Sequence, residues 1–281
     1  MASARSENTN GALNSARYET KQLKISQEAD KEYCAQLTQQ ANKFGLGKDT
    51  YAMAFKALHW QSAQQLKLSA SEVLNAFHSS VIVTFIQLSM LLVVGNVIFG
   101  IDSISIVMPD SITTLALRFV CTVLMHLQVE ADIRQGLRMM KYLPNHREDF
   151  SAPGNAFVVG LMQAIVGICT ELSCILYLGS INAEIDVIIR FIALGSIAKV
   201  DDFYYNALPG ENRVLGKVKE LSVKLHRRHF RDPEVGQAER DCGYFFTRFI
   251  YKTMRIFYSS FIFYFFPYFT LVAPYLFRAV N

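Results

Sequence analysis

The chain lacks the short motifs that mark most soluble enzymes. It has no GxSxG nucleophile elbow, no GxxxxGK(S/T) phosphate loop, no HExxH zinc motif and no GxGxxG in a nucleotide-binding context. It also carries no recognisable nucleic-acid-binding module, and its net charge is only +4. We therefore expect a protein that is not an enzyme, uses no cofactor and binds no nucleic acid.

Cysteine is scarce and is not arranged for chemistry. The five cysteines have no metal-ligand spacing with histidines, and three of them lie inside apolar segments. We expect buried thiols that act as small apolar side chains, with neither a disulfide framework nor a metal site. Acylation of Cys34 or Cys242 is an alternative. The first 67 residues contain no basic-then-apolar leader, so we expect no cleaved secretory peptide.

Charged residues are also few, at 19% of the chain, and the 51% that are hydrophobic gather in blocks of about 20 residues, the length that a helix needs to cross a bilayer. We predict an all-α fold, a polytopic membrane helical bundle with four core spans, an aromatic C-terminal span and amphipathic interfacial helices. The aromatic span bends near Pro267, and a four-span chain with a re-entrant end stays open. The predicted spans are about 71–99, 111–129, 156–178, 185–200 and 256–276.

The flanking sequences divide the chain into four parts. These are a polar N-terminal region with amphipathic helices (1–70), the four-span bundle (71–209), a basic amphipathic helix and linker (210–242), and an aromatic interfacial segment with the C-terminal membrane helix (243–281). Within the first part, Asp49 can cap a helix. That helix either packs on its own protein or lies in the headgroup plane of the membrane.

Basic residues are unevenly distributed between the predicted loops. The loops at 100–110 and 179–184 have none, whereas 130–148 and 199–240 have many. The positive-inside rule therefore predicts a multi-pass protein with its N-terminus on the cytoplasmic side. The basic helix is either a solvated surface helix or a binder of anionic phospholipids. The residues expected to contact lipid headgroups are Lys217, Lys219, Lys224, Arg227, Arg228, Arg248, Lys252 and Arg255.

Several charged residues fall inside or beside the apolar spans, where they are expected to face one another. Counting depth along antiparallel helices at about 1.5 Å per residue predicts a buried cluster of Arg118, Glu171 and Arg190. The cluster either fixes helix register or leaves a positive charge that binds an anion. A second layer is predicted near the basic side, with His126 and Gln163 between the two layers. Its members are Glu130, Asp132, Lys199, Asp201 and Asp202.

Two segments carry a resemblance to other proteins. FSAPGNAFVVGLMQAIVGICTELSCILYL and FIALGSIAKVDDFYYNALP resemble a loose group of uncharacterised protist multi-pass membrane proteins, in which a Met-Gln and a glutamate in one span precede an Asp-Asp-aromatic at the end of the next. The resemblance covers about residues 139–209 and implies an α-helical membrane protein without assigning an activity.

Together these patterns favour a non-enzymatic, oligomeric integral membrane protein that organises or shapes a bilayer, or that is a structural subunit of a larger membrane assembly. Its expected partners are the lipid bilayer, anionic phospholipids and either further copies of itself or a larger membrane complex. The alternative is an ion channel or small-solute transporter that uses the buried charged residues as a polar path. Broken helices would favour the alternative.

Overall fold

The computed structural model describes residues 43–44, 46–59, 67–98, 108–207, 225–226 and 242–280. The chain divides into two compact units, Met1–Gly45 with Lys224–Arg227, and Leu46–Val223 with Arg228–Asn281. In the first unit, β1 (Lys43–Phe44) and β2 (Leu225–His226) form an antiparallel pair.

The strand β2 corrects the predicted basic helix at Leu225 and His226. A 3.6-residue apolar period reports spacing within one window, and it cannot reveal a backbone partner that lies far away in the sequence. The rest of that helix lies outside the described residues. The same holds for five of the predicted headgroup contacts, which are Lys217, Lys219, Lys224, Arg227 and Arg228.

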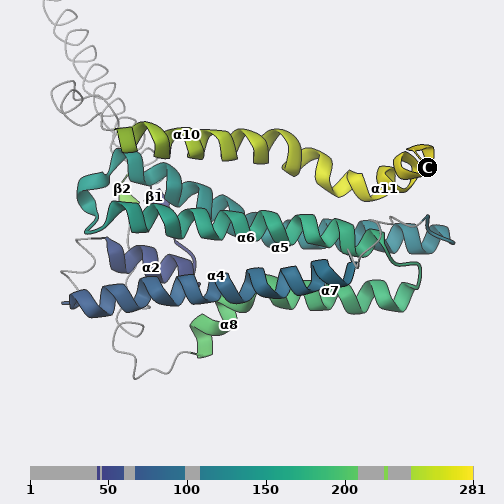
Figure 1. Cartoon of the computed structure of the whole chain (residues 1–281), viewed down its shortest axis with the longest axis horizontal. Helices are drawn as coiled ribbons and strands as arrows, with labels where there is room; N and C mark the ends of the chain where they lie inside the picture. The colour runs from purple at the N-terminus through teal and green to yellow at the C-terminus, as the bar shows by residue number, and fades with distance from the viewer. Residues whose placement is uncertain are drawn as a thin grey trace, which may run out of the picture. The chain divides into compact units, whose positions relative to one another are not determined.

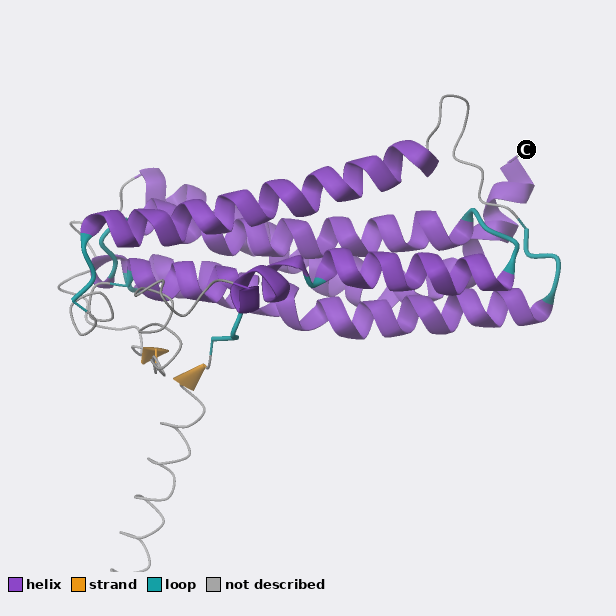
Figure 2. Cartoon of the chain, turned by 90° about the horizontal axis from the view of Figure 1, so that it is seen from below, coloured by secondary structure: helices purple, strands orange, loops and turns teal. Residues whose placement is uncertain are grey.

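The second unit is a bundle of α-helices, which confirms the predicted all-α fold class (Figures 1 and 2). Helix α6 packs against α2, α4, α5 and α7, and the C-terminal helices pack against α5. The helices are α2 (Thr50–Leu58), α4 (Ala70–Ile98), α5 (Ile112–Tyr142), α6 (Pro153–Gly179), α7 (Glu184–Ala198), α8 (Val200–Ala207), α10 (Cys242–Phe257) and α11 (Phe263–Val280).

Three helices are long and apolar enough to cross a membrane, namely α4 over Ala70–Gly95, α5 and α6. A fourth is added if Phe245–Phe266 and Tyr268–Leu276 count as one span, which is bent by 76°. The bend predicted near Pro267 is therefore confirmed, and proline explains it because its ring removes a backbone donor. The predicted span 185–200 is too long, because α7 has only 15 residues and ends before Lys199.

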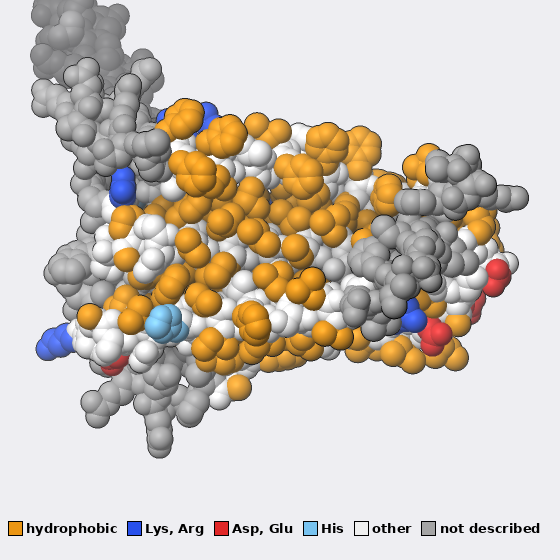
Figure 3. Space-filling view, viewed as in Figure 1, with side chains coloured by type: hydrophobic (Ala, Val, Ile, Leu, Met, Phe, Trp, Pro, Cys, Tyr) orange, Lys and Arg blue, Asp and Glu red, His pale blue; other side chains and the backbone are white. Residues whose placement is uncertain are grey.

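Large apolar side chains cover the outside of the bundle. Phe85 and Leu92 of α4 are 71% and 73% exposed, and Phe245 of α10 is 73% exposed. Figure 3 shows hydrophobic side chains over most of one face of the described helices. Exposed apolar surface of this extent is unusual for a soluble monomer. Together with the long apolar helices it indicates a membrane-embedded protein.

Helix α2 lies inside the bundle. Asp49 caps it by accepting a hydrogen bond from the Ala52 amide at 2.7 Å, as predicted, and every residue from Thr50 to Leu58 is buried. The helix packs against α4, α6 and α8. The reading in which it lies in the headgroup plane is therefore wrong over these residues. Its sequence, TYAMAFKAL, is apolar on nearly all sides, which is typical of a buried helix.

Glycines bring α5 and α6 unusually close together. A Cβ atom added at Gly136 would lie 2.7 Å from the Gly160 carbonyl oxygen and 2.9 Å from the Ala164 amide nitrogen. Small residues at such contacts let the backbones of two membrane helices approach closely. This contact fixes which residues of α5 face which residues of α6.

We predict that Gly136→Ala destabilises the protein, because the new methyl group meets backbone atoms that cannot rotate away. The expected loss is about 1–3 kcal/mol of unfolding free energy, measured by thermal unfolding in detergent. The control is Gly154→Ala, where an added Cβ meets nothing within 4 Å. Alanine there should be neutral or stabilising by up to about 1 kcal/mol. Equal destabilisation by both changes would contradict the close packing.

Candidate functional site

The predicted cluster of Arg118, Glu171 and Arg190 does not form. Arg118 is fully buried, and it donates from Nε to the Ile181 carbonyl oxygen at 2.8 Å and from Nη2 to Asn182 Oδ1 at 2.9 Å. Its Nη2 also donates to the Ile181 carbonyl. The guanidinium group thus stabilises the turn that follows α6 by donating hydrogen bonds to it. Carbonyl groups at the end of a helix carry partial negative charge, which favours a cation there.

The other two members of the cluster have their own partners. Glu171 Oε1 lies 2.6 Å from His126 Nδ1, and the Arg190 guanidinium lies 4.5 Å from the centroid of the Tyr177 ring. Although all three predicted members lie in the described part of the chain, no ion pair joins them.

The predicted cluster is wrong because of the helix register. Depth counting assumed that Arg118 lies level with Glu171. In the structure His126 is the residue level with Glu171, eight residues further along α5, which is about 12 Å at the helical rise. A count of residues from each helix end cannot supply the relative shift of two helices.

The second predicted layer comes together in part. Asp132 and Asp201 line the same cavity, and the half-buried Asp202 lies within electrostatic reach of both. Lys199 is exposed at the end of α7 but lies within electrostatic reach of Asp132. Glu130 instead pairs with Arg134 on its own helix. Of the other predicted residues, Arg248, Lys252 and Arg255 are exposed on α10, where headgroup contact stays a prediction.

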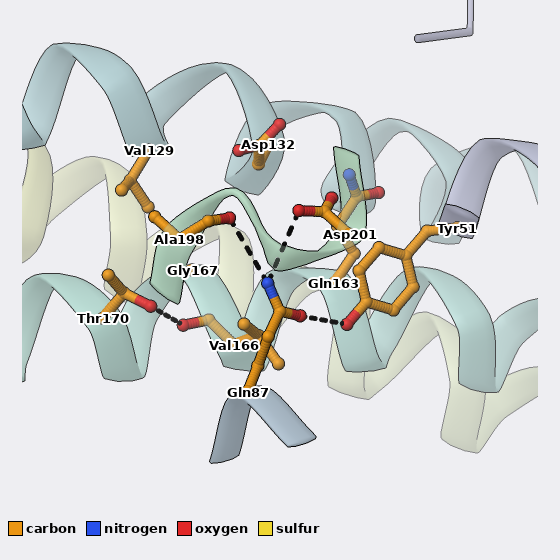
Figure 4. A pocket seen from close by; sticks show the side chains of 10 residues that line it. All are labelled: Tyr51, Gln87, Val129, Asp132, Gln163, Val166, Gly167, Thr170, Ala198 and Asp201. Atoms are coloured by element: carbon orange, nitrogen blue, oxygen red, sulfur yellow. Dashed lines mark hydrogen bonds between the residues drawn. The ribbon is translucent and has the colours of Figure 1, made fainter. Parts of the chain in front are cut away.

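The cavity lies between six helices (Figure 4). The space within the cavity that the centre of a water molecule can occupy is about 10 Å³. This is enough for about one water molecule. Helices α2, α4, α5, α6, α7 and α8 each contribute side chains. The lining residues are Tyr51, Gln87, Val129, Asp132, Gln163, Val166, Gly167, Thr170, Ala198 and Asp201.

Gln87 of α4 links the helices around the cavity. Its Oε1 accepts a hydrogen bond from the Tyr51 hydroxyl at 2.8 Å. Its Nε2 lies 3.3 Å from the Ala198 carbonyl oxygen and 3.5 Å from Asp201 Oδ1 (Figure 4). The same nitrogen lies 3.2 Å from the Ile197 carbonyl oxygen. The amide of Gln87 is therefore the donor that meets the last carbonyls of α7.

The helix breaks at this point. Helix α7 ends at Ala198, Lys199 has non-helical backbone angles, and α8 begins at Val200. The C-terminal carbonyls of α7 carry partial negative charge. The last residue of α7, Ala198, lines the cavity together with the buried Asp201 and the half-buried Asp132. The region is rich in acceptors and suits a positively charged or proton-donating occupant.

One buried donor in the cavity wall has no partner. Gln163 is 2% exposed, and its Nε2 makes no hydrogen bond within the described residues. Its Oε1 accepts from Gln135 Nε2 at 3.4 Å. A buried amide donor left without a partner costs about 1–3 kcal/mol, so the site has unused hydrogen-bonding capacity next to the two aspartates.

Sequence reasoning treated Asp49 only as a helix cap and missed its place beside this site. Asp49 is 4% exposed, and it accepts a hydrogen bond from Gln135 Nε2 at 2.7 Å. Gln135 thereby connects Asp49 to Gln163. The sequence did hold a signal: the helix after Asp49 is apolar on nearly every side, so a cap on that helix must be buried with it. Tyr51 and Gln87 were missed as site residues because neither is charged.

Burial dominates the electrostatics of the acidic groups. It raises the pKa of Asp201 to about 8, and the nearby charges of Asp49, Asp132 and Asp202 act in the same direction. Burial also raises the pKa of Asp49, although hydrogen bonds from the Ala52 amide and Gln135 oppose that shift. Asp201 therefore holds a proton at neutral pH. Among the described residues, no group of three or more His, Cys, Asp or Glu side chains is placed to hold a metal ion.

No family model, curated protein or solved structure matches this chain. The resemblance to protist multi-pass membrane proteins therefore stays an expectation from the sequence.

We predict that the protein in detergent loses stability as the pH rises from about 4 to about 8. The pKa of Asp201 is 3.8 in the unfolded chain and about 8 in the folded protein. As the pH rises between these two values, the unfolded chain has lost this proton and the folded protein still holds it, so unfolding is increasingly favoured. The penalty grows by at most about 1.4 kcal/mol per pH unit for one group. Thermal unfolding of Asp201→Asn should depend less on pH, and a variant curve parallel to that of the wild type would contradict the assignment.

Proposed function

We propose that the protein is a non-enzymatic, multi-pass integral membrane protein that binds and passes a small cation, in the simplest case a proton, through its helical bundle. The observation that carries this proposal is the break between α7 and α8, where Ala198, Asp201, Asp132 and Gln163 line one cavity. The Nε2 of Gln163 has no hydrogen-bond partner among the described residues. In transporters, the ends of broken helices supply coordinating carbonyls in this way.

Buried polarity beside membrane-length helices supports the proposal. Burying ionisable side chains among such helices is costly, and it is typical of ion paths and proton relays. Here the polar residues continue from the cavity along facing sides of α5 and α6. Val129 and Thr170 line the cavity, and His126 and Glu171 lie next to them along the same two helices. Further along α5, Arg118 lies at the turn between α6 and α7.

A second candidate function is that of a structural subunit in a larger membrane assembly or homo-oligomer. It is favoured by the aromatic face of the C-terminal helices, which stays exposed in the single chain. Such faces anchor a helix in lipid or against another subunit. Its strongly exposed members are Phe245, Phe246, Phe249, Phe261, Tyr264, Phe265 and Tyr268.

The proposed orientation places the N-terminus, the 143–152 connection and the cavity toward the cytoplasmic side. It rests on the basic residues of 130–148 and on their absence from 179–184. We predict that a membrane-impermeant maleimide applied outside intact cells labels Ala183→Cys and spares Asn145→Cys, both made in a cysteine-free chain. Labelling of Asn145→Cys alone would reverse the orientation, and labelling of both or neither would contradict the proposed spans.

We predict that purified protein in liposomes dissipates an imposed pH gradient, followed with an enclosed pH-sensitive dye. Asp201→Asn should lose this activity, because the amide cannot accept and release the proton. The matched control is Asp186→Asn, an exposed carboxyl on the neighbouring helix α7 that should leave the flux unchanged.

Absence of flux for the wild type, with ordered oligomers in the same membranes, would overturn the transport proposal and favour the structural one. Full flux in Asp201→Asn would show that the cavity does not carry the path.

A further inference from the structure

A second buried polar site lies next to the cavity, between α5, α6 and the C-terminal helix. His126 Nδ1 and Glu171 Oε1 are 2.6 Å apart, and the two side chains are 6% and 1% exposed. A contact this short between a ring nitrogen and a carboxyl oxygen is typical of a charge-assisted hydrogen bond. The pair is therefore a place where a proton is shared.

Two polar atoms near this pair lack partners. Glu171 Oε2 and the Tyr258 hydroxyl are both buried and make no hydrogen bond within the described residues. Tyr258 lies within electrostatic reach of Glu171, Glu130 and Arg134. One atom is an acceptor that needs a donor, and the other can donate. The structure thus places complementary, unused hydrogen-bonding groups in one apolar environment.

The surrounding side chains hold the three residues near one another. The centroid of the Phe263 ring lies 5.5 Å from that of His126 and 6.3 Å from that of Tyr258. The guanidinium group of Arg134 lies 5.0 Å from the centroid of the Phe263 ring. Tyr258 begins a π-helical turn, Tyr258–Ile262, between α10 and α11. Such turns are common at functional sites, because the extra residue redirects side chains.

We propose that His126, Glu171 and Tyr258 form a second proton-binding site. When loaded, the site has no net charge, and its exchangeable proton lies between His126 Nδ1 and Glu171 Oε1. When that proton leaves, a neutral histidine and a carboxylate remain. The Tyr258 side chain then moves so that its hydroxyl donates a hydrogen bond to Glu171 Oε2, which has no partner among the described residues. This hydrogen bond stabilises the negative charge in its apolar surroundings.

The groups that face the site decide its ligand. Helix α5 contributes Glu130 and Arg134, which are paired with each other and leave little net charge. Helix α6 contributes the buried thiol of Cys174, which also lies within electrostatic reach of Glu171. With a single carboxyl group and one imidazole, the site offers too few ligands for a metal ion, and it carries no excess positive charge for an anion.

This site adjoins the cavity along α5 and α6, so on the proposed path a proton would reach it directly from the cavity. Asp132, Val129 and His126 follow one another at three-residue intervals along α5, which places them on one side of the helix. Thr170 of the cavity wall directly precedes Glu171. The role of the site in transport rests on the proposed function, whereas its proton binding does not.

The test is solid-state NMR of the full chain labelled with ¹⁵N-histidine in lipid bilayers. A strongly deshielded proton is expected at His126 Nδ1, assigned by its loss in His126→Gln, and it should disappear in Glu171→Gln. In Tyr258→Phe the pH at which the site is half-protonated should rise by about one to two units, because one hydrogen bond to the charged form is lost. The control is Tyr264→Phe, since Tyr264 is 66% exposed on α11, and it should not move that pH.

The outcomes separate this inference from the proposed function. A wild-type His126 resonance without the deshielded proton, or a Tyr258→Phe titration equal to that of the wild type, would overturn the site even if Asp201→Asn abolishes flux. The expected NMR results in a protein that passes no protons would support the site and overturn transport. Glu171→Gln with full flux would show a proton site that lies off the path.

Discussion

The close backbone contact between α5 and α6 is the constraint on which the interior of this bundle depends. Gly136 and Gly160 bring the two helices so near that a single added methyl group would meet backbone atoms. Because helix surfaces interlock only at certain shifts, this contact selects one antiparallel register. The register places His126 opposite Glu171, and Arg118 opposite the turn after α6. The pairing of the charged side chains is thus set by small residues that carry no charge.

The short length of α7 is a second constraint on the interior of the bundle. Helix α7 has 15 residues, so its last carbonyls end inside the bundle, where the Gln87 amide donates to them. Backbone groups inside an apolar interior need partners. Gln87 supplies part of that need at the α7 carbonyls, and the side chains of Asp49 and Gln135 accept hydrogen bonds from the Ala52 and Gly47 amides. The same arrangement leaves Asp201 buried near Asp49, Asp132 and Asp202, and the proposed proton or cation site rests on this grouping.

The sequence predicted the fold more completely than the site. Blocks of apolar residues, the Asp49 cap and Pro267 were sufficient for the all-α class, the start of α2 and the bend in the C-terminal helix, because these depend on local properties. The Arg118–Glu171–Arg190 cluster was wrong because register is a property of two helices together. Asp132 and Asp201 were correctly placed in one layer, since both follow closely after the ends of their predicted spans, at 129 and 200. Gln163 was predicted between the two charged layers, and it lines the cavity. Tyr51 and Gln87 were absent from the predicted site residues because uncharged polar residues give no distinct signal in an apolar span.

Cross-linking between cysteine pairs introduced across α5 and α6 in a cysteine-free chain tests the register of these two helices most directly. Oxidation in membranes should form a disulfide rapidly between His126→Cys and Glu171→Cys. It should form none between Arg118→Cys and Glu171→Cys, because Arg118 lies about two helical turns along α5 from the position opposite Glu171. Efficient cross-linking of the second pair in place of the first would contradict the register and, with it, the arrangement of the buried acidic groups.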